Sequence, residues 1–79
     1  MRYRYVVRIS EADVGKRVVI RWRRPADDEV ADVLGVLESA TAEAFAVRKA
    51  SGELITVPRD RAMAAKPIPP APSKNPRPR

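Results

Sequence analysis

Apolar and polar residues alternate with a period of two in several parts of the chain, most clearly over residues 17–23. There, Val18, Ile20 and Trp22 are separated by residues that include arginines. An alternation of this kind is typical of a β-strand that buries one face and exposes the other. Because Trp22 shares the apolar face, we expect its ring in the core or at the core's rim rather than as a stacking platform for bases.

Shorter alternations predict further strands at 3–9, 31–38, 44–48, 54–57 and 62–66. The segment 27–37 is ambiguous, because Asp27, Asp28 and Glu29 would also suit the first turn of a helix. Gly35 and the valines of this segment favour a strand over a helix. We therefore predict that this part of the chain is extended.

Turn signals separate the predicted strands. Gly15 and Gly52 are free to adopt the positive φ that tight turns need, and Pro25 marks a loop. Single short helical turns fit at 10–13 and 58–61. Short strands at this spacing are typical of a small barrel or sandwich, and we predict an all-β fold, a small five-stranded SH3-like barrel. The apolar positions that we expect in its core are Val14, Val18, Ile20, Val33, Leu37, Phe45, Val47, Ile55, Val57 and Met63.

The composition of the chain changes at Pro67. Six of the eight prolines lie in 67–79, and proline lacks the backbone N–H and has a fixed φ. We therefore predict that residues 1–66 form the barrel and that residues 67–79 form a basic tail or linker, disordered or in polyproline-II conformation. Within this tail, Ile68 is the hydrophobic anchor.

The residue types most used in catalysis are missing. The 79-residue chain has no histidine and no cysteine, which excludes zinc fingers, imidazole metal sites, disulfides and Ser-His or Cys-His catalysis. Its three glycines are isolated, so no glycine-rich phosphate cradle exists. The acidic run 27–29 lacks the spacing of an EF-hand, and we interpret it as a solvated turn. We expect no enzyme activity, no cofactor and no metal.

Positive charge is concentrated at both ends of the chain, whose net charge is +6. Residues 1–24 hold eight basic and two acidic residues, and residues 67–79 hold three basic residues and no acidic one. Such an asymmetry favours a polyanionic partner, and the strand alternation places several arginines on a face towards solvent. The residues that we expect to contact phosphates without reading a base sequence are Arg4, Arg8, Arg17, Arg21 and Arg23.

Nothing in the sequence suits insertion into a membrane. No apolar run approaches the roughly 20 residues that a membrane-spanning helix needs. The first residues, Met-Arg-Tyr-Arg-Tyr, lack the apolar stretch of a signal peptide. We therefore expect a cytoplasmic protein with no membrane partner.

Four runs of the sequence resemble one known module. They are 13–21, 32–39, 45–59 and 64–72, the last of which reads Ala-Ala-Lys-Pro-Ile-Pro-Pro-Ala-Pro. Together they resemble the SH3-like domain at the N-terminus of actinobacterial GNAT-family acetyltransferases, a histone-acetyltransferase-like group. The resemblance implies an accessory domain whose proline-rich segment leads to a catalytic domain. The acetyl-CoA loop of that family has no counterpart here, so no catalytic or cofactor-binding residue is implied.

Three functions stay open on this basis. The first is a non-catalytic accessory or interaction module that binds a protein partner, in particular a GNAT acetyltransferase domain. The second is a small basic barrel that binds nucleic acid weakly and non-specifically through its arginine-rich face. The third is a subunit or remnant of an acetyltransferase. An unbroken arginine surface in the structure would favour the second.

Overall fold

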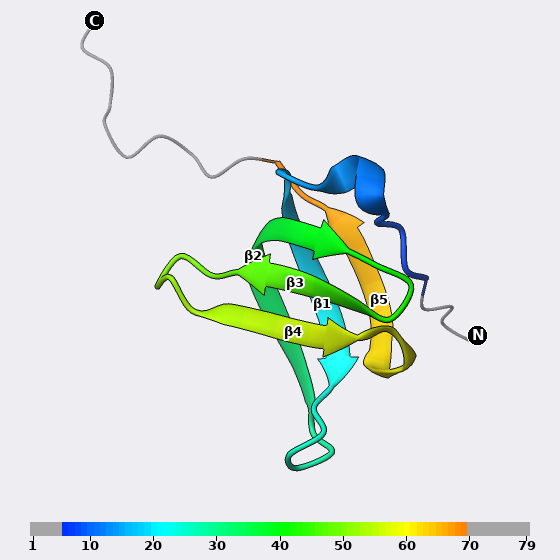
Figure 1. Ribbon diagram of the computed structural model, residues 1–79. Helices are drawn as coiled ribbons and strands as arrows, with labels where there is room; N and C mark the ends of the chain where they lie inside the picture. The colour runs from blue at the N-terminus through cyan, green and yellow to red at the C-terminus, as the bar shows by residue number, and fades with distance from the viewer. Residues whose placement is uncertain (1–5, 70–79) are drawn as a thin grey trace, which may run out of the picture.

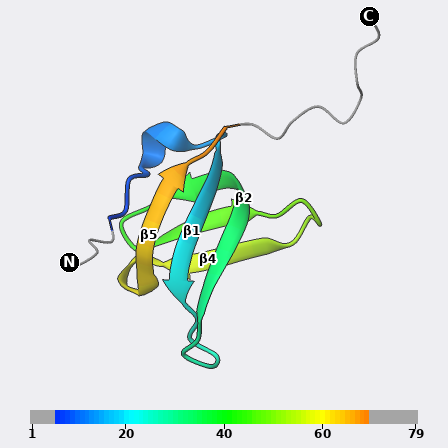
Figure 2. The same ribbon diagram turned by 180° about the vertical axis from the view of Figure 1, so that it is seen from behind.

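The computed structural model describes residues 6–69, which form a single curved antiparallel sheet (Figure 1). Its strands are β1 (Arg17–Arg23), β2 (Val30–Ala40), β3 (Ala44–Arg48), β4 (Leu54–Pro58) and β5 (Ala62–Pro67). Their order across the sheet is β4-β3-β2-β1-β5. The long β2 bends over, so that β3 and β4 cross in front of β1 and β5 in Figure 1 and behind them in Figure 2. The predicted all-β, five-stranded small barrel is confirmed.

Period-two alternation accounts for the central pair of strands. Val18, Ile20 and Trp22 of β1 are buried, and the residues between them face outwards. The segment that also suited a helix is the extended strand β2, whose Val33 lies opposite Ile20. Trp22 is 9% exposed, so its predicted place in the core is confirmed. Among residues 6–69, the buried apolar residues are Ile9, Val18, Ile20, Trp22, Val33, Leu37, Phe45, Val47, Val57 and Ala65.

Two short 3₁₀ turns, η1 (Glu11–Asp13) and η2 (Arg59–Arg61), occupy the places where helical turns were expected. Reciprocal hydrogen bonds close η1. The Ser10 hydroxyl oxygen accepts from the Ala12 N–H at 3.2 Å, and the Asp13 carboxylate accepts from the Ser10 N–H at 3.0 Å. The tight turns predicted at the two glycines are also present, with φ of 94° at Gly15 and 96° at Gly52.

Gly35 lies on β2 where two backbones approach closely. A Cβ at this position would overlap the backbone carbonyl oxygen of Arg48 and would lie 2.8 Å from its carbonyl carbon. It would also lie 3.0 Å from Cγ1 of Val47. The tight curl of β2 towards β3 therefore depends on the absence of a side chain here.

A bulge in strand pairing explains one of the three errors in the predicted core, that at Met63. The β1–β5 register shifts so that Trp22 lies opposite Ala62 and Arg21 opposite Ala64. Met63 is the extra residue of this bulge and is only half-buried, while Ala65 occupies the inward position. Val14 is wrong as a core residue, because it ends η1 and is 45% exposed.

Ile55 is half-buried and packs against the core from β4. It lies on the sheet's edge strand, where no further strand covers it.

The prediction of a strand at 3–9 is wrong for residues 6–9, the part of this range that the structure describes. Residues 6–10 make an isolated parallel bridge, between Val7 and Ala65, instead of a strand. Ile9 is nevertheless buried at 5% exposure, because this segment crosses the barrel beside β5. The apolar alternation therefore marked burial correctly and secondary structure incorrectly.

At the other end, β5 runs to Pro67, which lies opposite Val18. Proline fits there because β5 is an edge strand of the sheet. The Ile68 N–H then donates to the Arg17 carbonyl at 2.9 Å. The rest of the predicted proline-rich tail, from Pro70 on, lies outside the described residues. Within 6–69, no helix is long and apolar enough to cross a membrane.

Candidate binding groove

The outer face of the sheet carries a mixed surface of cations and apolar side chains. Along β1, Arg17, Val19, Arg21 and Arg23 face outwards. Strand register places three of these side chains in rows that cross the sheet. The rows are Lys66–Val19–Leu34, Ala64–Arg21–Asp32 and Arg17–Val36–Arg48–Leu54.

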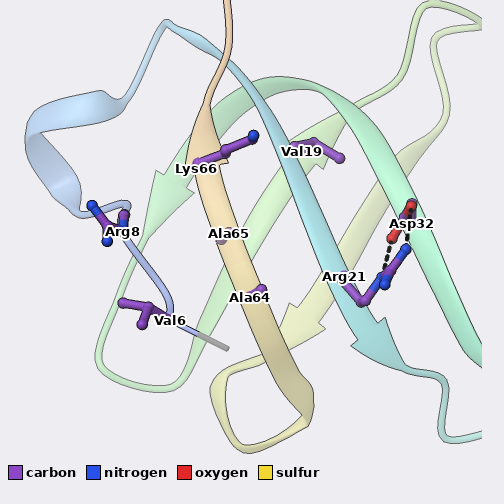
Figure 3. A pocket seen from close by; sticks show the side chains of 8 residues that line it. All are labelled: Val6, Arg8, Val19, Arg21, Asp32, Ala64, Ala65 and Lys66. Carbon is purple, nitrogen blue, oxygen red and sulfur yellow. Dashed lines mark hydrogen bonds and ion pairs between the residues drawn. The ribbon is translucent and has the colours of Figure 1, made fainter. Parts of the chain in front are cut away.

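An open groove of about 390 Å³ lies on this face, between the N-terminal segment and β1 (Figure 3). It is lined by Val6, Arg8, Val19, Arg21, Asp32, Ala64, Ala65 and Lys66. Two of these residues come from before η1, two from β1, one from β2 and three from β5. The groove therefore exists only when the first and last parts of the domain have come together.

Backbone hydrogen bonds fix the N-terminal wall of the groove. The Arg8 N–H donates to the Ala65 carbonyl at 2.7 Å, and the Ala65 N–H donates to the Val6 carbonyl at 3.1 Å. Figure 3 shows the side chains of Val6 and Arg8 on one side of β5, with Val19 and Arg21 on the other. The alanines of β5 form the floor between these two walls.

The opposite wall contains a two-point ion pair. Nε of Arg21 lies 3.0 Å from one carboxylate oxygen of Asp32, and Nη2 lies 3.3 Å from the other. The Arg21 hydrogen bonds, together with its positive charge, hold the pKa of the Asp32 carboxyl below its ordinary value. Asp32 is therefore an anion at neutral pH and balances much of the arginine's charge within the groove.

Arg8 and Lys66 are in a different situation. Both side chains are exposed, and within residues 6–69 neither takes part in an ion pair or a side-chain hydrogen bond. The groove thus holds three cations and one carboxylate. Its uncompensated positive charge lies at these two residues.

The arginines proposed from the sequence do not share one environment. Arg8 and Arg21 line the groove. Arg17 is half-buried, and its Nη1 donates to the Pro69 carbonyl at 3.3 Å, while Nη1 of Arg23 donates to the Asp28 carbonyl at 2.8 Å. Arg4 lies outside the described residues. The proposed phosphate-contacting set stays a prediction, with Arg8 and Arg21 brought together at the groove.

Lys66, Val6 and Asp32 belong to the groove but were not singled out from the sequence. Strand pairing brings Lys66 opposite Val19 and Asp32 opposite Arg21. Val6 reaches the groove through the parallel contact between Val7 and Ala65, which no local pattern signals. The excess of basic residues in 1–24 nevertheless indicated that a surface containing this segment would be positively charged.

Arginines hold two of the three carboxylates in the acidic turn 27–29, those of Asp27 and Asp28. The Glu29 N–H and the Arg24 guanidinium both donate to Asp27, and they hold the pKa of its carboxyl below the ordinary value. Asp28, whose φ is 59°, pairs with Arg61 at 3.2 Å. Within 6–69, no group of three or more acidic residues is placed to hold a metal ion.

Comparison with known proteins identifies one family. Residues 12–66 match the family described as the Rv0428c N-terminal Sm-like domain, a match that runs from η1 to the end of β5 except its last residue. No curated protein and no solved structure matches the chain. The matched segment is well over half of the 79 residues and coincides with the small β-barrel. The chain therefore belongs to the family of the Rv0428c N-terminal Sm-like domain.

Proposed function

We propose that this protein is a non-catalytic accessory module that binds a protein partner through the outer face of its sheet. The observation that carries the proposal is the apolar surface of β2. Leu34 and Val36 are 43% and 42% exposed, although they lie near the middle of the sheet. Exposed apolar side chains grouped on one face are typical of surfaces that contact other proteins.

The neighbours of these residues extend the same surface. Val19 lies opposite Leu34 on β1, and Leu54, which is 44% exposed, lies in the same row as Val36. Arg17 and Arg48 lie on either side of Val36 in this row. Arg48, which separates Val36 from Leu54, is held to Glu38 by two hydrogen bonds of 2.9 and 3.1 Å. An apolar centre with a charged rim is the usual anatomy of a protein interface.

The carboxyl groups support a role other than acid–base catalysis. A carboxyl that acts as a general acid at neutral pH needs a raised pKa, which burial or a neighbouring negative charge would supply. Asp27, Asp32 and Glu38 instead have pKa values below their ordinary ones, because arginines or a backbone N–H donate to them. No charged or polar residue of 6–69 is buried. These groups suit a charged surface better than a reaction centre.

The partner that we propose is an acetyltransferase domain of the GNAT family. The proposal rests on the resemblance of four sequence runs to the domain that precedes such enzymes, and on a family whose name places the barrel at an N-terminus. The corresponding experiment mixes the purified chain with a GNAT catalytic domain from the same genome. We expect a one-to-one complex by light scattering, and no acetyl transfer from acetyl-CoA by the chain alone.

Leu34→Glu tests whether β2 makes the contact, with Ser51→Glu in the β3–β4 turn as a control of equal added charge. We expect the first variant to abolish the complex and the second to leave it intact. A complex that survives Leu34→Glu would place the contact elsewhere. Absence of any complex with the parent chain would refute an acetyltransferase partner.

Nucleic acid stays the alternative partner. Arg21→Glu combined with Arg23→Glu, titrated against a fluorescent oligonucleotide at low salt, tests it directly. A micromolar or weaker affinity that falls with salt and is lost in the double variant would support this alternative. Binding that is absent, or indifferent to the two substitutions, would remove it.

A further inference from the structure

We infer that the groove beside β5 is a binding site for an acidic protein segment, in which carboxylates meet Arg8 and Lys66 and an apolar side chain enters between Val6 and Val19. This inference rests on the proposed protein-binding function and names the chemistry of the segment that is bound. It concerns the part of the outer face beside β5, which adjoins the exposed apolar residues of β2 at Val19.

Charge is the first argument. Arg8 and Lys66 flank the groove from the N-terminal segment and from β5, and no described carboxylate lies in an ion pair with either. The available anion, Asp32, is already held by two hydrogen bonds from Arg21. Two exposed cations that have no partner among residues 6–69 favour a binding partner that brings carboxylates.

Shape and polarity are the second argument. The accessible apolar surface of the groove comes from Val6, Val19 and Ala64, because Ala65 is only 4% exposed. Val6 is 45% exposed, and Val19 is half-buried. An aliphatic side chain placed there would remove these apolar atoms from water, at about 25 cal/mol for each Å² that is buried. An acidic segment with one or more aliphatic residues satisfies both parts of the surface.

The wall that carries Arg8 is also fixed in place before any partner arrives. The two backbone hydrogen bonds to Ala65 set the direction of the segment, and Ile9 anchors its far end in the core. A partner therefore loses little free energy in ordering this wall.

The groove suits a protein segment better than a nucleic-acid backbone. Single-stranded nucleic acids are usually bound by aromatic side chains that stack on the bases, together with cations. None of the described residues that line the groove is aromatic.

Fluorescence anisotropy with synthetic peptides tests the inference. The probe is a fluorescein-labelled peptide in which glutamates alternate with leucines. One control peptide has glutamine in place of glutamate, and another has serine in place of leucine. We expect binding of the probe that weakens with salt, and markedly weaker binding of both controls. A labelled single-stranded oligonucleotide serves as the nucleic-acid arm.

The test variant combines Arg8→Glu with Lys66→Glu. Its matched control combines Lys16→Glu with Lys49→Glu, which changes the net charge equally at two turns away from the groove. Since exposed ion pairs are individually weak, we expect about a tenfold loss of probe affinity in the test variant and less than about a threefold loss in the control. Circular dichroism verifies that both variants fold.

Probe binding that is absent in the parent, or reduced equally by both pairs of substitutions, would overturn the inference. Tighter binding of the oligonucleotide than of the probe would also overturn it. The proposed function can be distinguished from this result. An acetyltransferase complex that is insensitive to Arg8→Glu with Lys66→Glu would leave the function intact and refute the groove alone.

Discussion

Gly35→Ala is a test of how closely β2 and β3 approach each other. The added Cβ would lie 2.8 Å from the carbonyl carbon of Arg48 and 3.0 Å from Cγ1 of Val47. Carbon atoms normally approach to about 3.5–4.0 Å, so β3 would have to move away by roughly 1 Å. Both obstructing groups belong to β3, which is held between β4 and β2 in the sheet. The nearest obstructing atom belongs to the backbone of Arg48, not to the end of a flexible side chain.

The cost follows from what such a movement disturbs. Overpacking a close-packed site costs about 1–3 kcal/mol, and weakening one or two hydrogen bonds of the β2–β3 ladder adds about 1 kcal/mol for each bond. A loss of about 2–5 kcal/mol is comparable with the total stability of a small domain, whose lower limit is about 5 kcal/mol. We therefore expect the melting midpoint to fall by at least about 10 °C, or the cooperative transition to disappear.

Thermal and urea unfolding followed by circular dichroism measure this effect. Gly52→Ala is the informative comparison, because its φ of 96° strains an alanine although no atom lies within 4 Å of the new Cβ. We expect a penalty of about 1–2 kcal/mol there from the backbone alone. A Gly35→Ala midpoint within a few degrees of the parent, or above that of Gly52→Ala, would refute the close-approach argument.

Three further predictions concern the core, the groove and the last strand. Phe45→Ala should cost about 3–5 kcal/mol, since this ring is fully buried, and a melt near that of the parent would contradict it. Arg21 lowers the pKa of the Asp32 carboxyl in the folded protein. The ionised carboxylate therefore stabilises the fold at pH values above the pKa that Asp32 has in the unfolded chain. This stabilisation is lost as the pH falls through the lower pKa of the folded protein. Urea midpoints should consequently fall more steeply on acidification in the parent than in Asp32→Asn; equal slopes would refute the linkage. Truncation after Lys66 should lower the melting midpoint relative to truncation after Pro69, because it removes the backbone contacts of the last part of β5; equal midpoints would show that these contacts contribute nothing.

Alternation along the sequence predicted most of the sheet because strand burial is a local, period-two property. β1 is the clearest case, with its burial following each apolar residue from Val18 to Trp22. The same reasoning failed at Met63, where the β1–β5 bulge inserts one residue. A bulge depends on how two strands meet, so neither strand's sequence reveals it alone.

The candidate groove was less predictable than the fold. Arg8 and Arg21 were singled out by charge, but nothing in the sequence paired residues 6–8 with Ala65, because a parallel bridge has no turn to signal it. The sequence also did not reveal why position 35 requires glycine. Its conformation needs no positive φ, and what requires glycine there is the carbonyl of a residue thirteen positions later.

The position of β5 has a consequence for how the chain folds. β1 pairs with β2 on one side and on the other with β5, which is the last of the described strands to leave the ribosome. During synthesis β1 therefore has one unpaired edge until residues 62–67 appear, and such edges invite pairing with other chains. Because this final pairing also spans most of the domain, it closes a long loop and should make folding slow for a protein of this size. A premature stop before β5 would thus yield a chain that is prone to aggregate rather than a smaller working barrel.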